Sequence, residues 1–148
     1  MSPQHAAATR MRSWQTALDE LRTAVQALLR GDGAHYKSLW SHGEDVTMMG
    51  AYGGLASGWG QVSETIDLSA ARYRDWSPRY REEIVTAQAT ADVAYLVLRE
   101  TVQNGDDDSS ARARRITLLF RRDDGRWRIF HHHSDPLHDP VSGRRNER

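Results

Sequence analysis

Apolar residues recur at every third or fourth position through the first part of the chain after Ser13. This spacing puts them on one side of a helix, which then buries one stripe against the rest of the molecule. Ser13 or Thr9 can cap the start, and Arg30 followed by Gly31 is a typical helix ending. The stripe consists of Trp14, Ala17, Leu18, Leu21, Ala24, Val25, Leu28 and Leu29.

Two further helices are predicted by the same criterion. Asp32 can cap a short helix with the apolar residues Tyr36, Leu39 and Trp40. After a short strand over residues 46–49 and a glycine-rich loop over 50–60, helical spacing returns from Trp59 onward. The third helix is expected to end at residues 76–78, Trp-Ser-Pro, because a residue before proline disfavours the helical conformation.

The chain after Pro78 has the character of strands. Residues 83–89, 93–102, 114–122 and 126–134 are four such runs, and turn residues at 104–105 and 123–125 join the last three as hairpins. Helices first and strands on consecutive hairpins later indicate an α+β fold with helices on one face of an antiparallel sheet. The polar tail over 139–148 is expected to be mobile.

Alternation along the last two strands predicts which residues share a face. If residues 123–125 form a three-residue loop, Thr117 lies opposite His131 and Arg115 opposite His133, whereas a two-residue turn would shift this register. The first face then holds Arg115, Thr117, Leu119, Trp127, Ile129, His131 and His133, and the second holds Ile116, Leu118, Phe120, Phe130 and His132. We expect the first face, with its polar groups, to form the helix-covered wall of a pocket, and the second to meet another subunit.

Composition narrows the classes of function. A chain of 148 residues is the size of one domain, and 20 basic against 20 acidic residues give no global field for nucleic acid or an anionic membrane. The absence of cysteine excludes disulfides, thiolate zinc sites and cysteine nucleophiles, and favours a cytoplasmic location. No apolar run suits a signal peptide or a membrane span. A small-molecule ligand is the partner that these numbers favour.

Several short motifs, taken in order, resemble one superfamily. They are residues 29–32 (LRGD), 39–40 (LW), 45–47 (DVT), 58–62 (GWGQV), 94–95 (AY), 115–122 (RITLLFRR) and 127–136 (WRIFHHHSDP). Together they resemble the SnoaL-like branch of the nuclear transport factor 2-like superfamily, over about residues 14–137. The resemblance implies a cone-shaped domain over residues 13–137, flexible segments at 1–12 and 138–148, a pocket between sheet and helices, and a homodimer through the open sheet face. Enzymes such as ketosteroid isomerase share this fold with non-catalytic transport factors and assembly domains, so the fold does not fix the function.

Two histidines are the first candidates for chemistry. His131 and His133 share a strand face and have side chains that titrate near neutral pH, so they suit general acid–base catalysis. A purely structural role for the same pair is the alternative. His131 and His133, together with His138, Asp135 or Asp139, also resemble a metal site. The expected fold does not obviously place the third ligand near the two histidines, so no metal or cofactor is predicted. His132 points the other way, toward the expected dimer face.

The remaining candidates would bind the ligand. Guanidinium groups and a hydroxyl on the predicted pocket face could bind an anionic or polar group of the ligand. Large aromatic side chains could contact the apolar part of the ligand. They are Arg99, Arg115 and Thr117, and Tyr36, Trp40, Tyr52, Trp59 and Trp127. The leading hypothesis is an isomerase, cyclase, dehydratase or hydrolase without a cofactor, acting on a small apolar carbonyl or hydroxyl compound. The alternative is a dimeric domain that binds a ligand, or assembles, without turnover.

Overall fold

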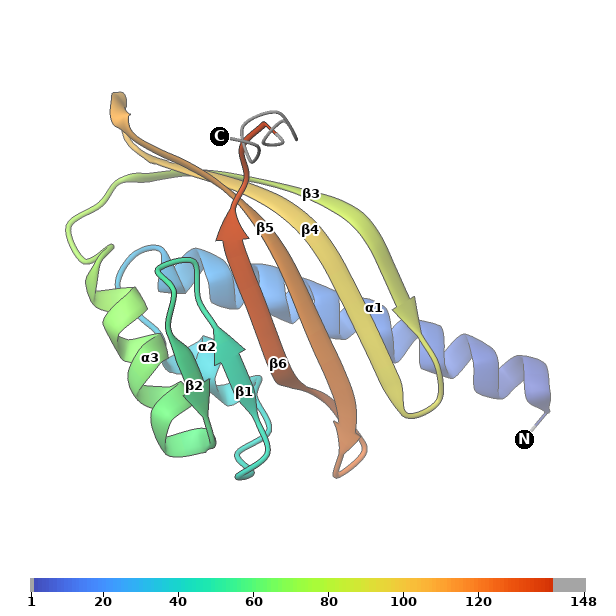
Figure 1. The fold of residues 1–148 in the computed structure, drawn as a ribbon. Coiled ribbons are helices and arrows are strands. Elements are labelled where there is room, and N and C mark those ends of the chain that lie inside the picture. The colour runs from blue at the N-terminus through green and yellow to red at the C-terminus, as the bar shows by residue number, and fades with distance from the viewer. Residues whose placement is uncertain (1, 140–148) are drawn as a thin grey trace, which may run out of the picture.

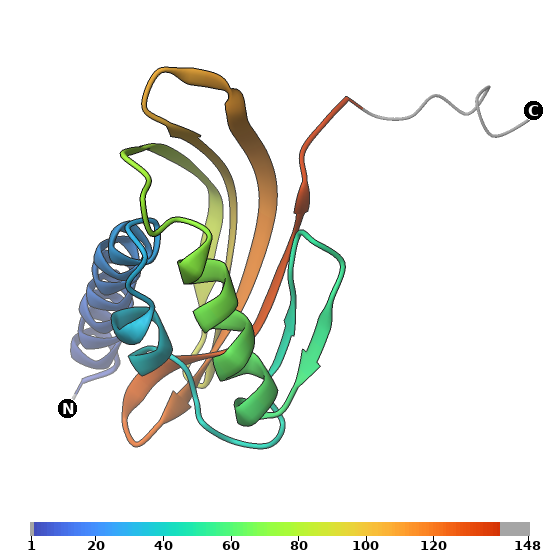
Figure 2. The same ribbon diagram turned by 90° about the vertical axis from the view of Figure 1, so that its left-hand side faces the viewer.

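Three helices cover one face of a curved six-stranded sheet in the computed structural model, which describes residues 2–139. Figure 1 looks at the sheet with α1 behind it, and Figure 2 shows all the helices on the same side of the strands. The strand order is β2-β1-β6-β5-β4-β3. The elements are α1 (Pro3–Leu28), α2 (Ala34–Ser38), β1 (Thr47–Met49), β2 (Leu55–Ser57), α3 (Trp59–Ala71), β3 (Pro78–Ala89), β4 (Val93–Asn104), β5 (Asp107–Asp123) and β6 (Arg126–Pro136).

The helix α1 begins earlier than the apolar stripe predicted. Ser2 caps it by accepting a hydrogen bond from the backbone N–H of His5 at 3.1 Å, and Pro3 occupies the first turn, where a missing N–H costs nothing. The start expected at Ser13 or Thr9 is therefore wrong, although the mobility of residues 1–12 stays a prediction. The expected mobile tail falls mostly on residues 140–148, outside the described part of the chain.

The sheet is mixed rather than wholly antiparallel. The four long strands pair antiparallel in sequence, as predicted, but β1 pairs parallel with β6, with Thr47 beside His131 and Met49 beside His133. The glycine-rich segment also contains the short strand β2, which pairs with β1. Three residues are too few for alternation to reveal a strand in sequence, so this element was missed.

The turn between β5 and β6 differs from the expected one and a β-bulge follows it. Asp123 pairs with Arg126 around a two-residue turn, in which both Asp124 and Gly125 have positive φ angles. The register then shifts by one residue, because Phe120 pairs with Ile129 while Leu119 pairs with His131. Trp127 and Ile129 therefore share the face of Phe120, and not the face of His131 as predicted.

The face that meets the helices is the one expected to be open. Most of its side chains are buried under α1, α2 and α3, while the opposite face of the sheet carries half-buried and exposed side chains. The covered face includes Leu96, Leu98, Glu100, Ile116, Leu118, Phe120, Trp127, Ile129 and His132. The assignment of Arg115, Thr117, His131 and His133 to the helix-covered side is thus wrong, because burying apolar area outweighs the placing of polar groups.

At one end of this covered face the core is tightly packed with aromatic side chains. Trp14 from α1 packs edge-on against Phe120 and Trp127, with ring centroids 4.9 and 5.6 Å apart. Trp40 and Ile129 are fully buried beside them. This packing fixes the first half of α1 on the sheet and leaves the second half to form the wall of a cavity.

Candidate active site in the cavity between helices and sheet

A cavity of about 390 Å³ lies between the second half of α1, the helix α3, the β1–β2 hairpin and the covered face of the sheet. Its size falls in the range of small-molecule sites. Most of its wall is apolar, contributed by Leu21, Val25, Leu28, Met48, Ile66, Leu98, Ile116 and Leu118. The polar side chains in the wall include Tyr36, Tyr52, Arg72, Tyr80, Glu82, Glu100, Arg114, His132 and Ser134.

Tyr36 and His132 form a hydrogen-bonded pair at the inner end of this wall. The Tyr36 hydroxyl lies 2.9 Å from Nδ1 of His132, and the two rings meet edge to face. Burial is the main cause that lowers the pKa of His132 to about 3, and the positive charges of His131, Arg114 and His133 add to it. Burial likewise raises the pKa of Tyr36, with a further contribution from the charge of Glu100. Both side chains are therefore neutral at neutral pH.

A neutral imidazole and a phenol hold two exchangeable protons between them. One proton is used in the hydrogen bond that joins Tyr36 to His132. The other remains on Nε2 of His132 or on the Tyr36 oxygen, depending on the imidazole tautomer. In either tautomer the pair keeps one donor for a third group, such as a carbonyl oxygen of a ligand.

Glu100 is the acidic counterpart in the same wall. It is only 8% exposed, and burial raises its pKa, against the lowering effects of the Arg114 charge and of a hydrogen bond from Tyr80. Arg114 Nη1 lies 3.8 Å from Glu100 Oε1, which is too long for a tight ion pair. A carboxyl group with a raised pKa in a partly apolar pocket is typical of general acids and bases.

Glu82 and Tyr80 on β3 close one side of the cavity. Tyr80 donates a hydrogen bond to Glu82 at 3.0 Å, and Glu82 forms an ion pair with Arg22 of α1 at 2.8 Å. The charge of Glu82 is compensated by Arg22, whereas Glu100 has only the distant Arg114. Glu100 is therefore the carboxylate that is best placed to exchange a proton with a ligand.

His131 and His133 lie on the opposite, open face of the sheet. They pair with Leu119 and Thr117, and His131 Nδ1 forms a hydrogen bond with the Thr47 hydroxyl at 2.7 Å. Partial burial lowers the pKa of His131, and the neighbouring His133 adds to this effect. The expectation that these two rings point into the pocket is wrong, because the bulge and the covered face give that position to His132. Acid–base chemistry at His131 and His133 stays a prediction from the sequence alone.

The other predicted ligand-binding residues divide into three groups. Arg99, Arg115 and Thr117 lie on the open face, where Arg115 forms a two-pronged ion pair with Asp135 at 2.7 and 2.8 Å. Trp40, Trp59 and Trp127 belong to the packed core. Only Tyr36 and Tyr52 of the ten predicted site residues line the cavity.

The sequence carried a signal for Glu100, although this residue is not among the predicted site residues. Along β4 the buried positions alternate as Ala94, Leu96, Leu98, Glu100 and Val102. A carboxylate at the apolar parity of a strand is costly unless it is paired or functional. Tyr80, Glu82 and Arg114 have no comparable signal, since polar residues on edge and end positions of strands are ordinary.

The described residues form neither a metal-binding cluster nor a membrane-spanning helix. In residues 2–139, no three side chains of His, Asp or Glu lie close enough together to hold a metal ion. None of the helices within that range has the length and apolar character needed to cross a bilayer.

Comparisons with known proteins agree with the architecture. A model of the SnoaL-like domain matches residues 14–137. No curated protein matches the chain in sequence.

Three solved structures illustrate the likeness in fold. An NTF2-like protein with a cystatin-like fold from Novosphingobium aromaticivorans has a TM-score of 0.71 at 18% identity, over 95% of this chain and 92% of that one. A candidate calcium/calmodulin-dependent protein kinase type II association domain from Thiobacillus denitrificans has 0.69 at 23%, over 84% and 94%. A candidate dehydratase of the NTF2-like family from Streptomyces avermitilis has 0.67 at 20%, over 89% and 99%. At such identities the likeness concerns the fold alone.

Proposed function

This chain belongs to the SnoaL-like domain family, and we propose that it is an enzyme that moves a proton on a small, mostly apolar carbonyl compound, in an isomerisation or a dehydration. The observation that carries the proposal is Glu100: a carboxyl group with a raised pKa in the wall of a mostly apolar cavity that also holds the neutral Tyr36–His132 pair. The chemistry requires side chains of this chain alone, so no cofactor is part of the proposal.

Glu100 acts as the base in this scheme. Its carboxylate takes a proton from the carbon next to the substrate carbonyl, and the electron pair of that C–H bond forms an enolate. The remaining donor of the Tyr36–His132 pair binds the enolate oxygen, where negative charge develops. Tyr36, His132 and Glu100 all line the same cavity, so one ligand can contact the base and the hydrogen-bond donor together.

The enolate has two ways forward. In an isomerisation, Glu100 returns the same proton to another carbon of the conjugated system. In a dehydration, the electron pair expels a hydroxide from the neighbouring carbon, and protonation of the leaving oxygen by Glu100 releases water. The likeness in fold to a candidate dehydratase supports the second course no more than the first.

The second candidate function is ligand binding without turnover. The favouring observation is the fold likeness to a candidate kinase association domain, which is named for association and not for a reaction. A cavity with a hydrogen-bonded pair and a carboxylate suits binding of a polar ligand as well as chemistry. Only turnover distinguishes the two functions.

Deuterium exchange tests the proposal without knowledge of the natural substrate. Tetralone or cyclohexenone is incubated with the protein in heavy water, and loss of the signal of the proton next to the carbonyl is followed by NMR. We expect exchange faster than in buffer, and a rate that rises with pH through the raised pKa of Glu100, because the carboxylate is the base. Glu100→Gln should lower the rate by about 10²–10⁴-fold.

Matched variants decide between the cavity and the open face. His133→Gln and His131→Gln change side chains outside the cavity and should leave the exchange rate unchanged. If these two variants lose the activity while Glu100→Gln keeps it, the prediction from the sequence is right and the proposal is wrong. A third outcome is that neither the original chain nor any variant exchanges deuterium faster than buffer, while a ligand copurifies and is identified by mass spectrometry. Binding without turnover would then replace the catalytic proposal.

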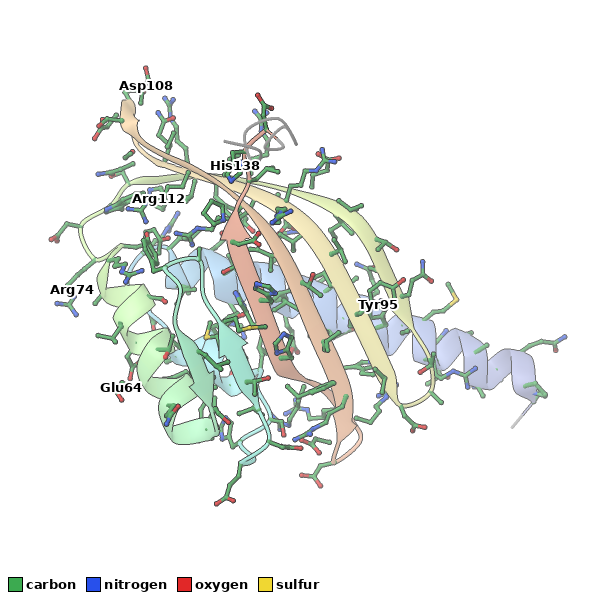
Figure 3. The ribbon with its side chains drawn as sticks, viewed as in Figure 1. Glu64, Arg74, Tyr95, Asp108, Arg112 and His138 are labelled. Atoms are coloured by element: carbon green, nitrogen blue, oxygen red, sulfur yellow. The ribbon has the colours of Figure 1, made fainter. Side chains whose placement is uncertain are left out.

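We also infer that the protein forms a homodimer through the open sheet face and works in the cytoplasm. The open face carries Tyr95, labelled in Figure 3, which is 41% exposed, and Val93, which is 47% exposed. Val97 lies on the same face of the same strand, and Leu119 on β5 lies between Tyr95 and His131. A face with this apolar content is costly to leave in water, and a second copy would cover it. Absence of cysteine is what supports the reducing compartment.

A further inference from the structure

Three arginines gather around one tyrosine where the cavity opens. Arg72 Cζ lies 3.5 Å from the centre of the Tyr52 ring, and the same atoms of Arg112 and Arg114 lie 5.6 and 5.3 Å from it. Arg112 also donates a hydrogen bond to the Tyr52 hydroxyl, as does Arg114 at 3.2 Å. Tyr52 is 56% exposed, so the group is in contact with solvent.

The group is assembled from distant parts of the chain. Tyr52 lies in the turn of the β1–β2 hairpin, Arg72 follows the last turn of α3, and the other two arginines lie on β5. Figure 3 shows Arg112 on β5 beyond the tip of that hairpin, on the side where α3 ends. Tyr52, Arg72 and Arg114 also line the cavity, so the positive group borders the space in which a ligand would lie.

These arginines lack the acidic partners that other arginines have. Arg22, Arg115 and Arg121 form ion pairs with Glu82, Asp135 and Asp45 at 2.8, 2.7 and 2.5 Å. Within residues 2–139, by contrast, Arg72 and Arg112 have no carboxylate at ion-pairing distance, and Arg114 has only Glu100 at 3.8 Å.

Three close positive charges with so little compensation repel one another. A tyrosine ring attracts them through its face, but it does not neutralise them. A ligand with negatively charged oxygens would supply the missing charge. Guanidinium groups bind such oxygens with two parallel hydrogen bonds, which makes arginine the usual residue for this purpose.

We propose that Arg72, Arg112 and Arg114, held by Tyr52, bind an anionic oxygen group at one end of an otherwise apolar substrate. The apolar part would then extend into the cavity among Leu21, Leu98 and Ile116, toward Glu100 and the Tyr36–His132 pair. This inference rests on the proposed function, since it names the substrate class of the same cavity. A carboxylate and a phosphate share the chemistry that the arginines recognise.

Binding of matched probes tests the inference. Naphthoate, naphthyl phosphate and the neutral naphthylmethanol share one apolar body, and their dissociation constants are measured by isothermal titration calorimetry. We expect at least one anion to bind about tenfold or more tightly than the alcohol, and its advantage to shrink as NaCl is raised. The tighter of the two anions identifies the group as a carboxylate or a phosphate.

Variants assign the preference to the arginine group. Arg72→Gln combined with Arg112→Gln should lower anion affinity about tenfold or more and leave naphthylmethanol binding unchanged, which also shows that the variant is folded. Arg99→Gln on the open face is the matched control and should change neither affinity.

The inference is overturned if neither anion binds more tightly than the alcohol, or if the double variant keeps the preference, or if Arg99→Gln removes it equally. These outcomes are separate from a failure of the proposed function. A preference for anions that depends on Arg72 and Arg112, in a protein that shows no deuterium exchange, would support the anion site and contradict only the catalytic proposal.

Discussion

His132 and Glu100 both line the cavity, and burial shifts their pKa values in opposite directions. Burial disfavours the charged form of each group, so it lowers the pKa of the imidazole and raises the pKa of the carboxyl group. A neutral histidine can donate a hydrogen bond without repelling a cation nearby. A carboxyl group with a raised pKa is a stronger base once it is ionised. Both shifts suit proton transfer in the cavity.

The shift at His132 predicts how stability depends on pH. The unfolded chain gains a proton at this residue as pH falls below 6.5, whereas the folded protein gains it only near 3. Stability is therefore present above pH 6.5 and is lost as pH falls through this window, by about 1.4 kcal/mol per pH unit for the single proton. His132→Gln, which cannot titrate, should flatten the dependence measured by urea unfolding between pH 7 and 5.

His133→Gln is the control for this measurement, because His133 is exposed on the open face. It should leave the pH dependence of unfolding close to that of the original chain. Equal slopes for the original chain and His132→Gln would mean that His132 does not titrate in the way its burial implies.

Among the elements, the end of α1 depends on one glycine. Gly31 has a φ angle of +95°, its N–H donates to the Leu28 carbonyl at 3.0 Å, and the N–H of Asp32 donates to the Ala27 carbonyl at 3.0 Å. This pair of hydrogen bonds ends the helix and turns the chain into α2, which brings Tyr36 to the cavity. A Cβ atom at position 31 would also lie 2.9 Å from the Cα atom of Arg74.

Gly31→Ala should therefore lower the free energy of unfolding by about 1–3 kcal/mol. The cause is a strained φ angle together with a clash against backbone that cannot move away easily. Thermal unfolding would show it as a melting temperature lower by about 3–10 °C. Gly54→Ala is the matched control, since its φ angle is not positive and a Cβ atom there meets nothing within 4 Å. Similar losses at both positions would contradict the role given to Gly31.

At the scale of the whole molecule, the proposed homodimer rests on the open face of the sheet. Helices cover one face only, as Figure 2 shows, so the apolar side chains of the other face need a partner or remain in water. Sedimentation at micromolar concentration should give twice the 16.8 kDa mass of the chain. Val97→Lys places a charge in the middle of the open face and should produce the monomer.

Gln26→Lys adds the same charge on the exposed side of α1 and should leave the dimer intact. A monomer for the original chain at this concentration would exclude the proposed dimer. A dimer that persists in Val97→Lys would place the interface elsewhere.

The sequence by itself determined the kinds of element and their order. The spacing of Trp14, Leu18 and Leu21 fixes a helix with one buried stripe, and alternation along residues 93–102 fixes a strand, because these periods follow from local backbone geometry. The order of helices and hairpins then leaves few arrangements, and the α+β fold with helices on one face of the sheet follows from them.

Only the tertiary structure decided which face of the sheet the helices cover and which side chains reach the cavity. A turn shorter by one residue places Trp127 and Ile129 on the face of Phe120, and one extra residue at Phe130 returns His131 to the face of Leu119; the local sequence gives no sign of that bulge. Burial of the apolar side chains of Leu96, Leu118 and Phe120 under the helices is then more favourable than burial of the polar groups on the other face. His132 and Glu100 thus replace His131 and His133 in the candidate site, because burial is a property of the assembled fold and not of any single strand.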